Sequence, residues 1–329
     1  YITGSVGSTH LGEAFTVDYH LPNRTAYTET CAAIAMAFFA RRMQKLEVDS
    51  RYADVIERVL YNGALSGLSL DGKAFFYENP LEIDPDFNDV YPAIKSSPHF
   101  PITQRLEVFT CSCCPPNVVR LLPAVADYAY GCDDDGTVYE HQYMDSTAAF
   151  DGVTLDVTTN YPADGVVRIK ASGAKKLALR IPGWCRSFTL DAPYVMENGY
   201  AVTDAAEVTL TLDMPVTVMA ANTRVHADAG RVAVMRGPVV YCMEGVDNDQ
   251  LYRQYMLFSL HGQTKDTYAK NQGTSWEYDV VKTQYKCNMP DILSALGLAQ
   301  LDRYDAMLSR RHELIERYNK AFEGLPIEV

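Results

Sequence analysis

The chain has 329 residues, of which 47% are hydrophobic and 22% charged, and its formal net charge is −13 at pH 7. This composition excludes a disordered or fibrous protein, and the length is sufficient for two domains with buried cores. The negative charge disfavours nucleic acid as a partner, because no stripe of Lys and Arg with interleaved aromatic residues offsets it. No window holds the roughly 20 apolar residues of a membrane-spanning helix, so we expect no membrane partner either.

The N-terminus and the cysteines bear on where the protein works. The sequence begins at Tyr1 without an initiator Met or the basic and apolar segments of a signal peptide, and we expect this start to be a cut. Among the eight cysteines, adjacent Cys113 and Cys114 could pair with each other only through a strained ring. Thiolate chemistry or metal binding is therefore favoured over a disulfide framework, which predicts a reducing compartment and a cytoplasmic location.

Two helices are predicted near the N-terminus. Residues 24–46 are rich in Ala, Met, Leu and Arg and contain no Gly or Pro, which favours a buried helix. Residues 49–67 predict a second helix, with Asp49 or Ser50 as its N-cap and Gly67 at its end.

A third helix is predicted after an extended, loop-like stretch. Pro115 and Pro116 suit the first turn of a helix, and the following apolar sequence extends that helix to Gly131. Residues 1–131 are therefore expected to form a mainly helical region.

Residues 132–249 show a different pattern. After the turn sequence CDDDG, strands are predicted between residues 137 and 245, in short runs of Val, Thr, Ile and Tyr separated by Gly, Asp, Asn and Pro. Examples are VTLDVTTNY, VVRIKA, KLALRI, AEVTLTLDM and RVAVMRGPVVYCM. Because no segment of helical length intervenes, this spacing favours a β-sandwich over a βαβ array.

Residues 250–329 form a third block. A polar loop is followed by two amphipathic helices, expected at residues 289–308 and 308–324. The predicted fold class is therefore α+β and multidomain, with a helical region, a β-sandwich and a short helical tail.

Four side chains form a candidate metal site. Glu29 and Cys31 lie on one segment and Cys113 and Cys114 on another, and together they offer the thiolates and the carboxylate that a tetrahedral Zn2+ site takes. Residues two apart do not share a helix face, so Glu29 and Cys31 can act together only where a helix starts or is irregular. The cysteine pair precedes two prolines at a predicted helix N-terminus, where free N–H groups lower thiol pKa values.

Other residues keep simpler interpretations at this point. Cys132, Cys185 and Cys242 are each expected to be core packing, because isolated cysteines are among the most buried residues. Glu13 lies in a Gly-flanked segment with two His and two acidic residues, and the spacing alone leaves both a solvated loop carboxylate and a functional group open.

Four motifs carry a resemblance to a known family. They are GSTHLGEAFTVDYHLPNRTAYTETCA, CSCCPPNVVRLL, RIPGWC and VAVMRGPVVYCMEGVDN, in this order over about 250 residues. The sequence resembles glycoside hydrolase family 127, the β-L-arabinofuranosidases. The resemblance implies a helical (α/α)6 barrel, present here only in part, followed by the β-sandwich.

The resemblance also implies roles for individual residues. Glu13 matches the general acid/base of a retaining hydrolase, and Cys113 matches the nucleophile, which is itself a zinc ligand. Glu29, Cys31 and Cys114 match the remaining Zn2+ ligands. The implied reaction releases L-arabinofuranose from β-L-arabinofuranosides, with an arabinofuranoside oligosaccharide or glycoconjugate as substrate. The nearby side chains of Tyr27, His20 and His10 are candidates for sugar contacts.

Two departures from the family accompany these expectations. Residues 1–131 hold too few helices for a closed barrel of twelve, so we expect a fragment or fused form with exposed apolar faces. Residues 252–325 instead resemble the DegT-type pyridoxal-phosphate sugar aminotransferases, without their cofactor-binding lysine motif. Alternatives to the glycosidase are a zinc-containing structural or carbohydrate-binding protein without catalysis, or a piece of such an aminotransferase. The oligomeric state stays open, a homodimer included.

Overall fold

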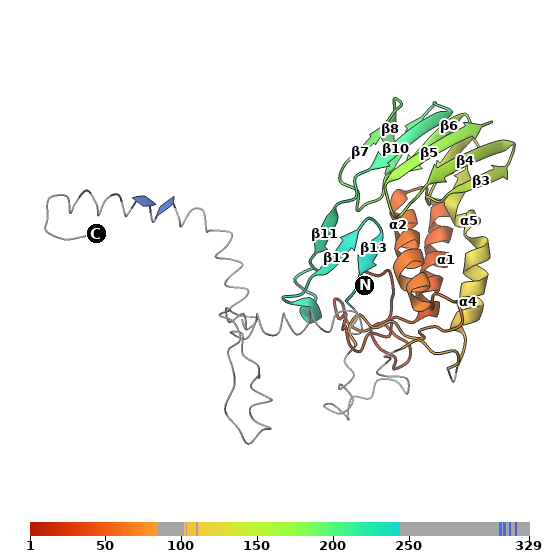
Figure 1. The fold of residues 1–329 in the computed structure, drawn as a ribbon. Helices are drawn as coiled ribbons and strands as arrows, with labels where there is room; N and C mark the ends of the chain where they lie inside the picture. The colour runs from red at the N-terminus through yellow and green to blue at the C-terminus, as the bar shows by residue number, and fades with distance from the viewer. Residues whose placement is uncertain are drawn as a thin grey trace, which may run out of the picture. The chain divides into compact units, whose positions relative to one another are not determined.

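The computed structural model describes residues 1–83, 102, 104–109 and 111–243, together with residues 309, 310, 312, 313, 316 and 320. The chain forms two compact units, Tyr1–Cys242 and Met243–Val329. The first unit is a mixed α+β structure, in which helices occupy the N-terminal part and three antiparallel or mixed sheets follow (Figure 1).

The two predicted N-terminal helices are present, and they pack against each other. Helix α1 is Thr30–Leu46 and buries Ala33, Ile34 and Ala37 along one face. Its start lies six residues after the predicted one, because the N–H groups of Tyr27 and Thr28 both bond to the Gly7 carbonyl and Thr28 has φ 37°, outside the helical region. The elements that follow it are α2 Ser50–Arg58, the π-helix η1 Val59–Ala64 and the 3-10 turn η2 Leu65–Gly67.

The boundaries of the second predicted helix are confirmed. Asp49 is the N-cap of α2, and its carboxylate accepts a hydrogen bond from the Arg51 N–H at 2.9 Å. The helical stretch closes at Gly67, after a change from α to π and 3-10 geometry.

The third predicted helix is broken. It divides into α4 Cys114–Leu121, the 3-10 turn η4 Leu122–Ala124 and α5 Ala126–Ala129. Pro123 explains the break, because proline has no N–H to donate and its ring clashes with the preceding turn. The expected end at Gly131 is wrong, since that residue already lies in strand β1.

Three sheets contain the predicted strands. The first has the order β1-β2-β6-β9-β8, the second β3-β4-β5-β10-β7 and the third β11-β12-β13. All neighbouring strands are antiparallel except β2 and β6, which are parallel. The strands are β1 Tyr130–Cys132, β2 Thr137–Glu140, β3 Ser146–Phe150, β4 Val153–Thr159, β5 Val166–Ser172, β6 Lys176–Arg180, β7 Phe188–Leu190, β8 Val195–Glu197, β9 Tyr200–Thr203, β10 Glu207–Leu212, β11 Val216–Met219, β12 Ala233–Arg236 and β13 Val239–Tyr241.

The two five-stranded sheets share one hydrophobic core. Buried and exposed residues alternate along β4 and β5, so each strand presents one face to the interior. Leu177 and Leu179 of the first sheet belong to the same buried cluster as Val157 and Ile169 of the second. A separate apolar cluster joins α1, α2 and α4.

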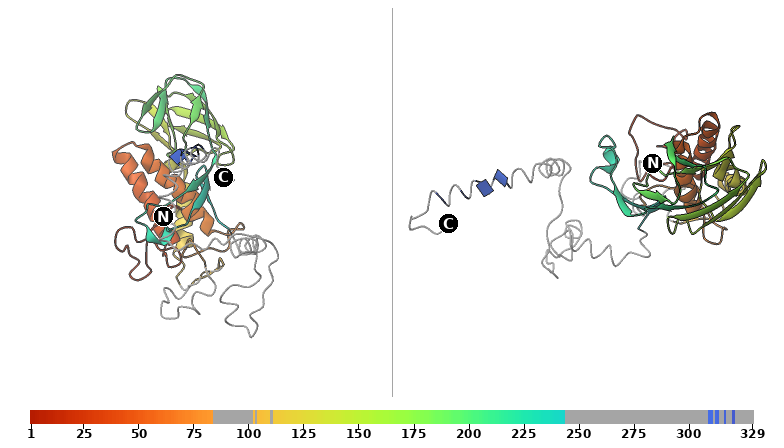
Figure 2. Two further views of the ribbon diagram at one scale, coloured as in Figure 1. Left: turned by 90° about the vertical axis from the view of Figure 1, so that its left-hand side faces the viewer. Right: turned by 90° about the horizontal axis from the view of Figure 1, so that it is seen from above.

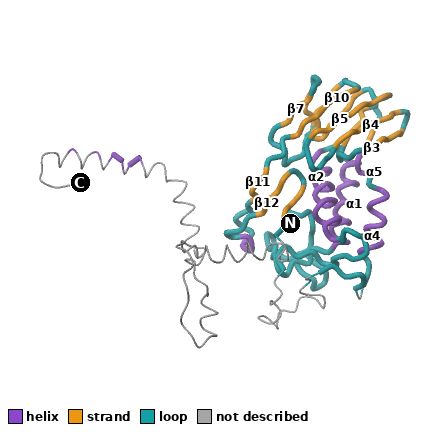
Figure 3. The backbone as a smooth tube through the Cα atoms, viewed as in Figure 1, coloured by secondary structure: helices purple, strands orange, loops and turns teal. Residues whose placement is uncertain are grey.

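The two five-stranded sheets lie at one end of the helices, and the N-terminal loops lie at the other, while the third sheet lies beside the helices (Figure 1). Gln44, near the end of α1, donates a hydrogen bond to the Tyr200 hydroxyl of β9, and α5 runs directly into β1. The loops gather at the other end, drawn in teal in Figure 3, and the side view in Figure 2 agrees. The N-termini of α1 and α4 are therefore at the loop end.

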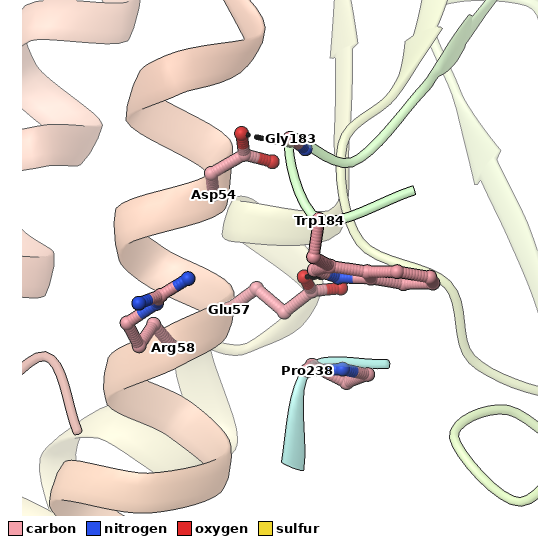
Figure 4. Close-up of a pocket in the computed structure, with 6 residues that line it drawn as sticks. All are labelled: Asp54, Glu57, Arg58, Gly183, Trp184 and Pro238. Carbon is pink, nitrogen blue, oxygen red and sulfur yellow. Dashed lines mark hydrogen bonds between the residues drawn. The ribbon is translucent and has the colours of Figure 1, made fainter. Parts of the chain in front are cut away.

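A buried ionic network ties α2 to the sheets. The Arg180 guanidinium of β6, whose side chain is 0% exposed, pairs with Glu57 and Asp54 at 2.5 Å each. Asp54 also accepts a hydrogen bond from the Gly183 N–H at 3.0 Å, and Glu57 accepts one from the Trp184 ring N–H at 3.0 Å (Figure 4). We call Asp54, Glu57, Arg180, Gly183 and Trp184 the Arg180 network.

The tail helices fall largely outside the described residues. Of the stretch 308–324, Ser309, Arg310, His312, Glu313, Glu316 and Lys320 are described, and each is helical. Arg310 and Glu313 form an exposed ion pair at 2.6 Å. The predicted helix at 289–308 lies outside the described part.

Candidate metal and active site

Glu29, Cys31, Cys113 and Cys114 lie together, although more than 80 positions separate the two pairs. Each offers one ligand atom, and these atoms all lie within 4.8 Å of one another. The Cys113 sulfur lies 3.3 Å from the sulfur of Cys31, 3.9 Å from that of Cys114 and 3.2 Å from Oε1 of Glu29. We call these four residues the thiol cluster.

The start of α1 lets Glu29 and Cys31 point to one place. Glu29 is the N-cap of α1, with φ −60° and ψ 141°, so its backbone is extended while Cys31 is already in the first turn. The Thr30 N–H donates to the Tyr77 carbonyl at 3.0 Å, which fixes this start against the neighbouring strand-like segment. The requirement that the sequence imposed on Glu29 and Cys31, a helix start, is met.

The start of α4 brings the other two ligands. Cys113 is the N-cap and Cys114 the first residue of the helix, and prolines occupy its first turn, as predicted. Cys114 is 0% exposed, whereas Cys113 is only partly buried. The site thus combines two helix N-termini, and the cysteines Cys31 and Cys113 are both partly exposed.

The donor set fits a divalent metal ion. A tetrahedral Zn2+ with sulfur at about 2.3 Å and oxygen at about 2.0 Å needs ligand atoms roughly 3.5 to 3.8 Å apart. The spacings in the thiol cluster, 3.2 to 3.9 Å around Cys113, are close to this requirement. Three thiols and one carboxylate are also ligands that zinc accepts in closed sites.

The pKa values of Cys113 and Cys114 are both raised, so the lowering expected from the helix N-terminus is wrong. A hydrogen bond from Cys114 lowers the pKa of Cys31 to about 7, whereas burial raises the pKa of Cys113 to about 12. The hydrogen bond to Cys31, together with burial, also raises the pKa of Cys114 above its ordinary value. Burial and the neighbouring groups oppose ionisation of Cys113 and Cys114, so three thiolates at this place require a bound positive charge.

Glu13 lies in a tight turn near the thiol cluster. The Glu13 N–H donates to the His10 carbonyl at 3.2 Å, and Glu13 has φ 49°, in the left-handed region. Its carboxylate is exposed and accepts a hydrogen bond from the Tyr27 hydroxyl at 3.0 Å. The exposed carboxylate thus has a side-chain partner in Tyr27.

Two tyrosines link Glu13 to Cys113. The Tyr27 hydroxyl donates a hydrogen bond to Glu13, and Tyr77 interacts with both Tyr27 and Cys113. Burial is the largest cause that raises the pKa values of both tyrosines, so both remain neutral phenols. Two tyrosine side chains, Tyr27 and Tyr77, therefore lie between the Glu13 carboxylate and the Cys113 sulfur.

The remaining predicted residues lie in varied surroundings. His20 is exposed and contacts the Thr16 hydroxyl at 2.6 Å, and desolvation lowers the pKa of His10. The core-packing prediction is wrong for Cys132 and Cys242, which are exposed because they lie at or beside the ends of sheet-edge strands. Cys185 is partly buried and packs against the core of the two larger sheets.

Sequence reasoning missed two residues of the site. Tyr77 lies in an extended segment whose approach to α1 no local pattern reveals. Asn117 donates from Nδ2 to the Cys31 sulfur at 2.9 Å. Its position three residues after Cys114 on a predicted helix was a usable signal, because such residues share a helix face.

Known families match this chain along most of its length. The model described as "Beta-L-arabinofuranosidase, GH127 catalytic domain" matches residues 1–127, and "Beta-L-arabinofuranosidase, GH127 middle domain" matches residues 137–214. "Glycoside hydrolase family 127 C-terminal domain" matches residues 216–293, and so extends past residue 250. The chain belongs to glycoside hydrolase family 127.

Individual relatives agree with this family. The non-reducing end β-L-arabinofuranosidase of Bifidobacterium longum subsp. longum is 46% identical over 268 residues, which cover 75% of this chain and 40% of the relative. The crystal structure of a GH127 β-L-arabinofuranosidase from Geobacillus stearothermophilus T6 has 44% identity and a TM-score of 0.67, covering 75% of this chain and 41% of that one. The chain thus spans about two fifths of the length of these relatives.

A shorter similarity involves a different protein. The spore coat polysaccharide biosynthesis protein SpsC of Bacillus subtilis is 41% identical over 81 residues, which cover 24% of this chain and 21% of SpsC. The predicted aminotransferase-like stretch, residues 252–325, lies almost entirely outside the described residues.

Among the described helices, none has the length and apolar character needed to cross a membrane.

Proposed function

We propose that the site of this chain serves a retaining glycoside hydrolase that releases L-arabinofuranose from β-L-arabinofuranosides, with a cysteine as nucleophile. The observation that carries the proposal is the thiol cluster, with Glu13 joined to its central sulfur through Tyr27 and Tyr77. The relatives of this chain that bear the name β-L-arabinofuranosidase supply the substrate class.

The cofactor in this proposal is Zn2+, held by Glu29, Cys31, Cys113 and Cys114. Their spacing and donor types support the assignment. When bound, the ion would keep the Cys113 sulfur ionised at neutral pH, against the burial that raises its pKa to about 12.

The chain's own residues would carry out two successive displacements. In the first, the Cys113 sulfur forms a bond to the anomeric carbon while the glycosidic C–O bond breaks and Glu13 gives its proton to the leaving oxygen. In the second, Glu13 takes a proton from water, whose oxygen bonds to the anomeric carbon as the C–S bond breaks. Two inversions leave the configuration of the sugar unchanged.

Tyr27 and Tyr77 have a supporting part in this scheme. The Tyr27 hydroxyl holds Glu13 at 3.0 Å, which fixes the carboxylate toward one side of the turn. Both tyrosines belong to an aromatic cluster with Phe75 and Phe109, which also packs against Cys113. The cluster supplies a rigid, partly dry wall for a sugar ring.

The arrangement of the fold is part of the proposal. We assign the helical part, residues 1–131, to a portion of an (α/α)6 barrel, and residues 132–249 to a β-sandwich followed by the block 250–329. The shared core of the two five-stranded sheets supports the sandwich, and the matches to the catalytic and middle domains change over near residue 131.

The decisive experiment is Glu13→Gln in the full-length protein that carries this sequence. Turnover of an aryl β-L-arabinofuranoside should be lost while the zinc content stays unchanged, because Gln cannot donate a proton to the leaving oxygen. The loss should be smaller for a nitrophenyl leaving group than for an alkyl one, since a good leaving group needs less protonation.

The matched control is Asp18→Asn, at an exposed carboxylate five residues further on. It should retain full turnover. If the Glu13→Gln protein still hydrolyses both substrates, Glu13 is not the acid/base, and the alternative of a structural zinc site without catalysis is favoured.

A further inference from the structure

A pair of side chains on α4 lies directly behind the thiol cluster. Asn117 donates from Nδ2 to the Cys31 sulfur at 2.9 Å, and Arg120 donates from its guanidinium to Oδ1 of Asn117 at 2.6 Å. Arg120 also lies over the Phe38 ring of α1, with its Cζ atom 4.7 Å from the ring centroid. The pair thus bridges the two helices whose N-termini form the cluster.

Arg120 determines which way the Asn117 amide faces. An arginine side chain has donors and no acceptor, so the amide atom opposite it must be the carbonyl oxygen. The amide nitrogen is then turned to the Cys31 sulfur, which has to act as an acceptor. The hydrogen-bond network therefore assigns the amide orientation and directs an N–H group at one particular ligand.

Charge explains why an N–H donor is useful at this place. Three thiolates and one carboxylate around a divalent ion leave an excess of negative charge at the site. A neutral amide N–H offsets part of this charge at sulfur without competing as a cation for the ligands. It also fixes the side-chain rotamer of Cys31, because the donor sits on a helix that packs against α1.

We propose that Asn117, oriented by Arg120, is a positioning residue that holds Cys31 as a ligand and sets the affinity of the thiol cluster for Zn2+. This inference rests on the proposed function, because it takes the cluster to be a metal site. It assigns to the CSCCPPN segment a role beyond the two proposed ligands Cys113 and Cys114, because the asparagine of the same helix turn orients a ligand contributed by the other segment.

The test measures zinc affinity in the full chain by competition with a chromophoric chelator under reducing conditions. Asn117→Leu keeps the approximate shape and removes the donor, and it should raise the zinc dissociation constant roughly 10- to 100-fold. Arg120→Gln leaves Asn117 in place but frees its orientation, and it should raise the constant by a smaller factor. Arg42→Gln, an exposed arginine on α1, is the matched control and should change nothing.

A spectroscopic readout separates positioning from a general loss of structure. With Co2+ in place of Zn2+, the sulfur-to-cobalt charge-transfer band should move to lower energy in Asn117→Leu, because a sulfur without its N–H donor is richer in electrons. A variant that merely loosens the fold would weaken this band without shifting it, and that result would overturn the proposal.

Failure of the proposal and failure of the metal site have different signatures. If Asn117→Leu and Arg120→Gln both bind zinc as the parent does while Cys31→Ser loses it, the metal site stands and the positioning role is wrong. If Cys31→Ser also keeps one tightly bound zinc, the cluster is not the metal site and both proposals fall. Should Asn117→Leu not fold, Arg120→Gln at the exposed end of the pair decides between the outcomes.

Discussion

Two regions of this protein bury ionisable side chains, and they do so in opposite ways. In the Arg180 network, the guanidinium of Arg180 is matched by the carboxylates of Glu57 and Asp54, and ring and backbone N–H groups complete the set. In the thiol cluster, four groups that become negative on ionisation face one another. In the Arg180 network the negative charges are balanced by a positive one, whereas the thiol cluster contains no cationic side chain and needs a bound cation if its groups ionise.

The presence or absence of a partner of opposite charge distinguishes a structural site, the Arg180 network, from the proposed ligand site, the thiol cluster. A buried ion pair with every partner present holds two elements in one register, whereas acidic groups brought together raise one another's pKa values and are stable only with a ligand. The small pocket formed by Asp54, Glu57, Arg58, Gly183, Trp184 and Pro238 belongs to the first kind, and none of its lining residues is in the thiol cluster. Four predictions test this division.

The largest effect is expected at Cys113, the proposed nucleophile. Cys113→Ala should lower turnover of an aryl β-L-arabinofuranoside by more than about 10,000-fold, because the proposed reaction forms its covalent bond at this sulfur. In the metal-free protein the same change should alter the free energy of unfolding by less than about 1 kcal/mol, since Cys113 is only partly buried. Cys185→Ala, at another partly buried cysteine, is the control and should leave turnover intact. A turnover within tenfold of the parent would remove Cys113 from the reaction.

The converse is expected in the Arg180 network. Arg180→Met should lower the free energy of unfolding by about 3 to 5 kcal/mol, because it leaves the carboxylate of Glu57 buried without its cation. Urea denaturation followed by circular dichroism measures this loss. Arg231→Met breaks an exposed pair with Glu82 and should cost less than about 1 kcal/mol. Equal losses in the two variants would contradict the structural role of the network.

Sequence patterns predicted the features of the thiol cluster and of the sheets that depend on residues close together in the sequence. Prolines after Cys114 predict the start of α4, and a helix start is the one place where Glu29 and Cys31 can act together. Alternating burial in β4 and β5 follows from the alternating residues. The break at Pro123 was also readable, because proline interrupts a helix.

Contacts between distant segments were not readable in the same way. The partner of Arg180 could have been any acidic residue, and its choice of Glu57 depends on how α2 packs against β6. Tyr77 reaches Cys113 only because its segment pairs with the start of α1. The resemblance to a family supplied the proposed ligand set, but the contact of Tyr77 with Cys113 became visible only in the folded structure.

A smaller effect is expected at the link between acid and thiol. Tyr27→Phe removes the hydroxyl that holds Glu13 at 3.0 Å, and a hydrogen bond to a charged group contributes about 1.5 to 3 kcal/mol. We therefore expect kcat to fall roughly 10- to 100-fold while the zinc content stays unchanged. Tyr194→Phe, at an exposed tyrosine outside the site, should leave kcat as it is. An unchanged kcat in Tyr27→Phe would show that Glu13 needs no such support.

The smallest effect concerns an exception within the sheet region, a buried carboxyl without a partner. Both oxygens of Glu140 are buried and lack a hydrogen-bond partner among the described residues, and burial raises the pKa of Glu140 well above its ordinary value although Arg180 opposes this. The folded chain then binds a proton that the unfolded chain has lost, so this contribution to stability is present below about pH 4.5 and declines as pH rises through the raised pKa.

Glu140→Gln tests this exception, because Gln has a similar shape and does not titrate. The unfolding free energy of Glu140→Gln relative to the parent should increase with pH, by up to about 1.4 kcal/mol for each pH unit between the two pKa values. Glu207→Gln, at an exposed position of β10, is the control and should show no such slope. A difference that stays constant with pH would mean that Glu140 ionises equally in both states and has a compensating partner like those of the Arg180 network. In that case every buried charge tested in the sheet region would have a partner of opposite sign, and the thiol cluster would differ from the sheet region in lacking one.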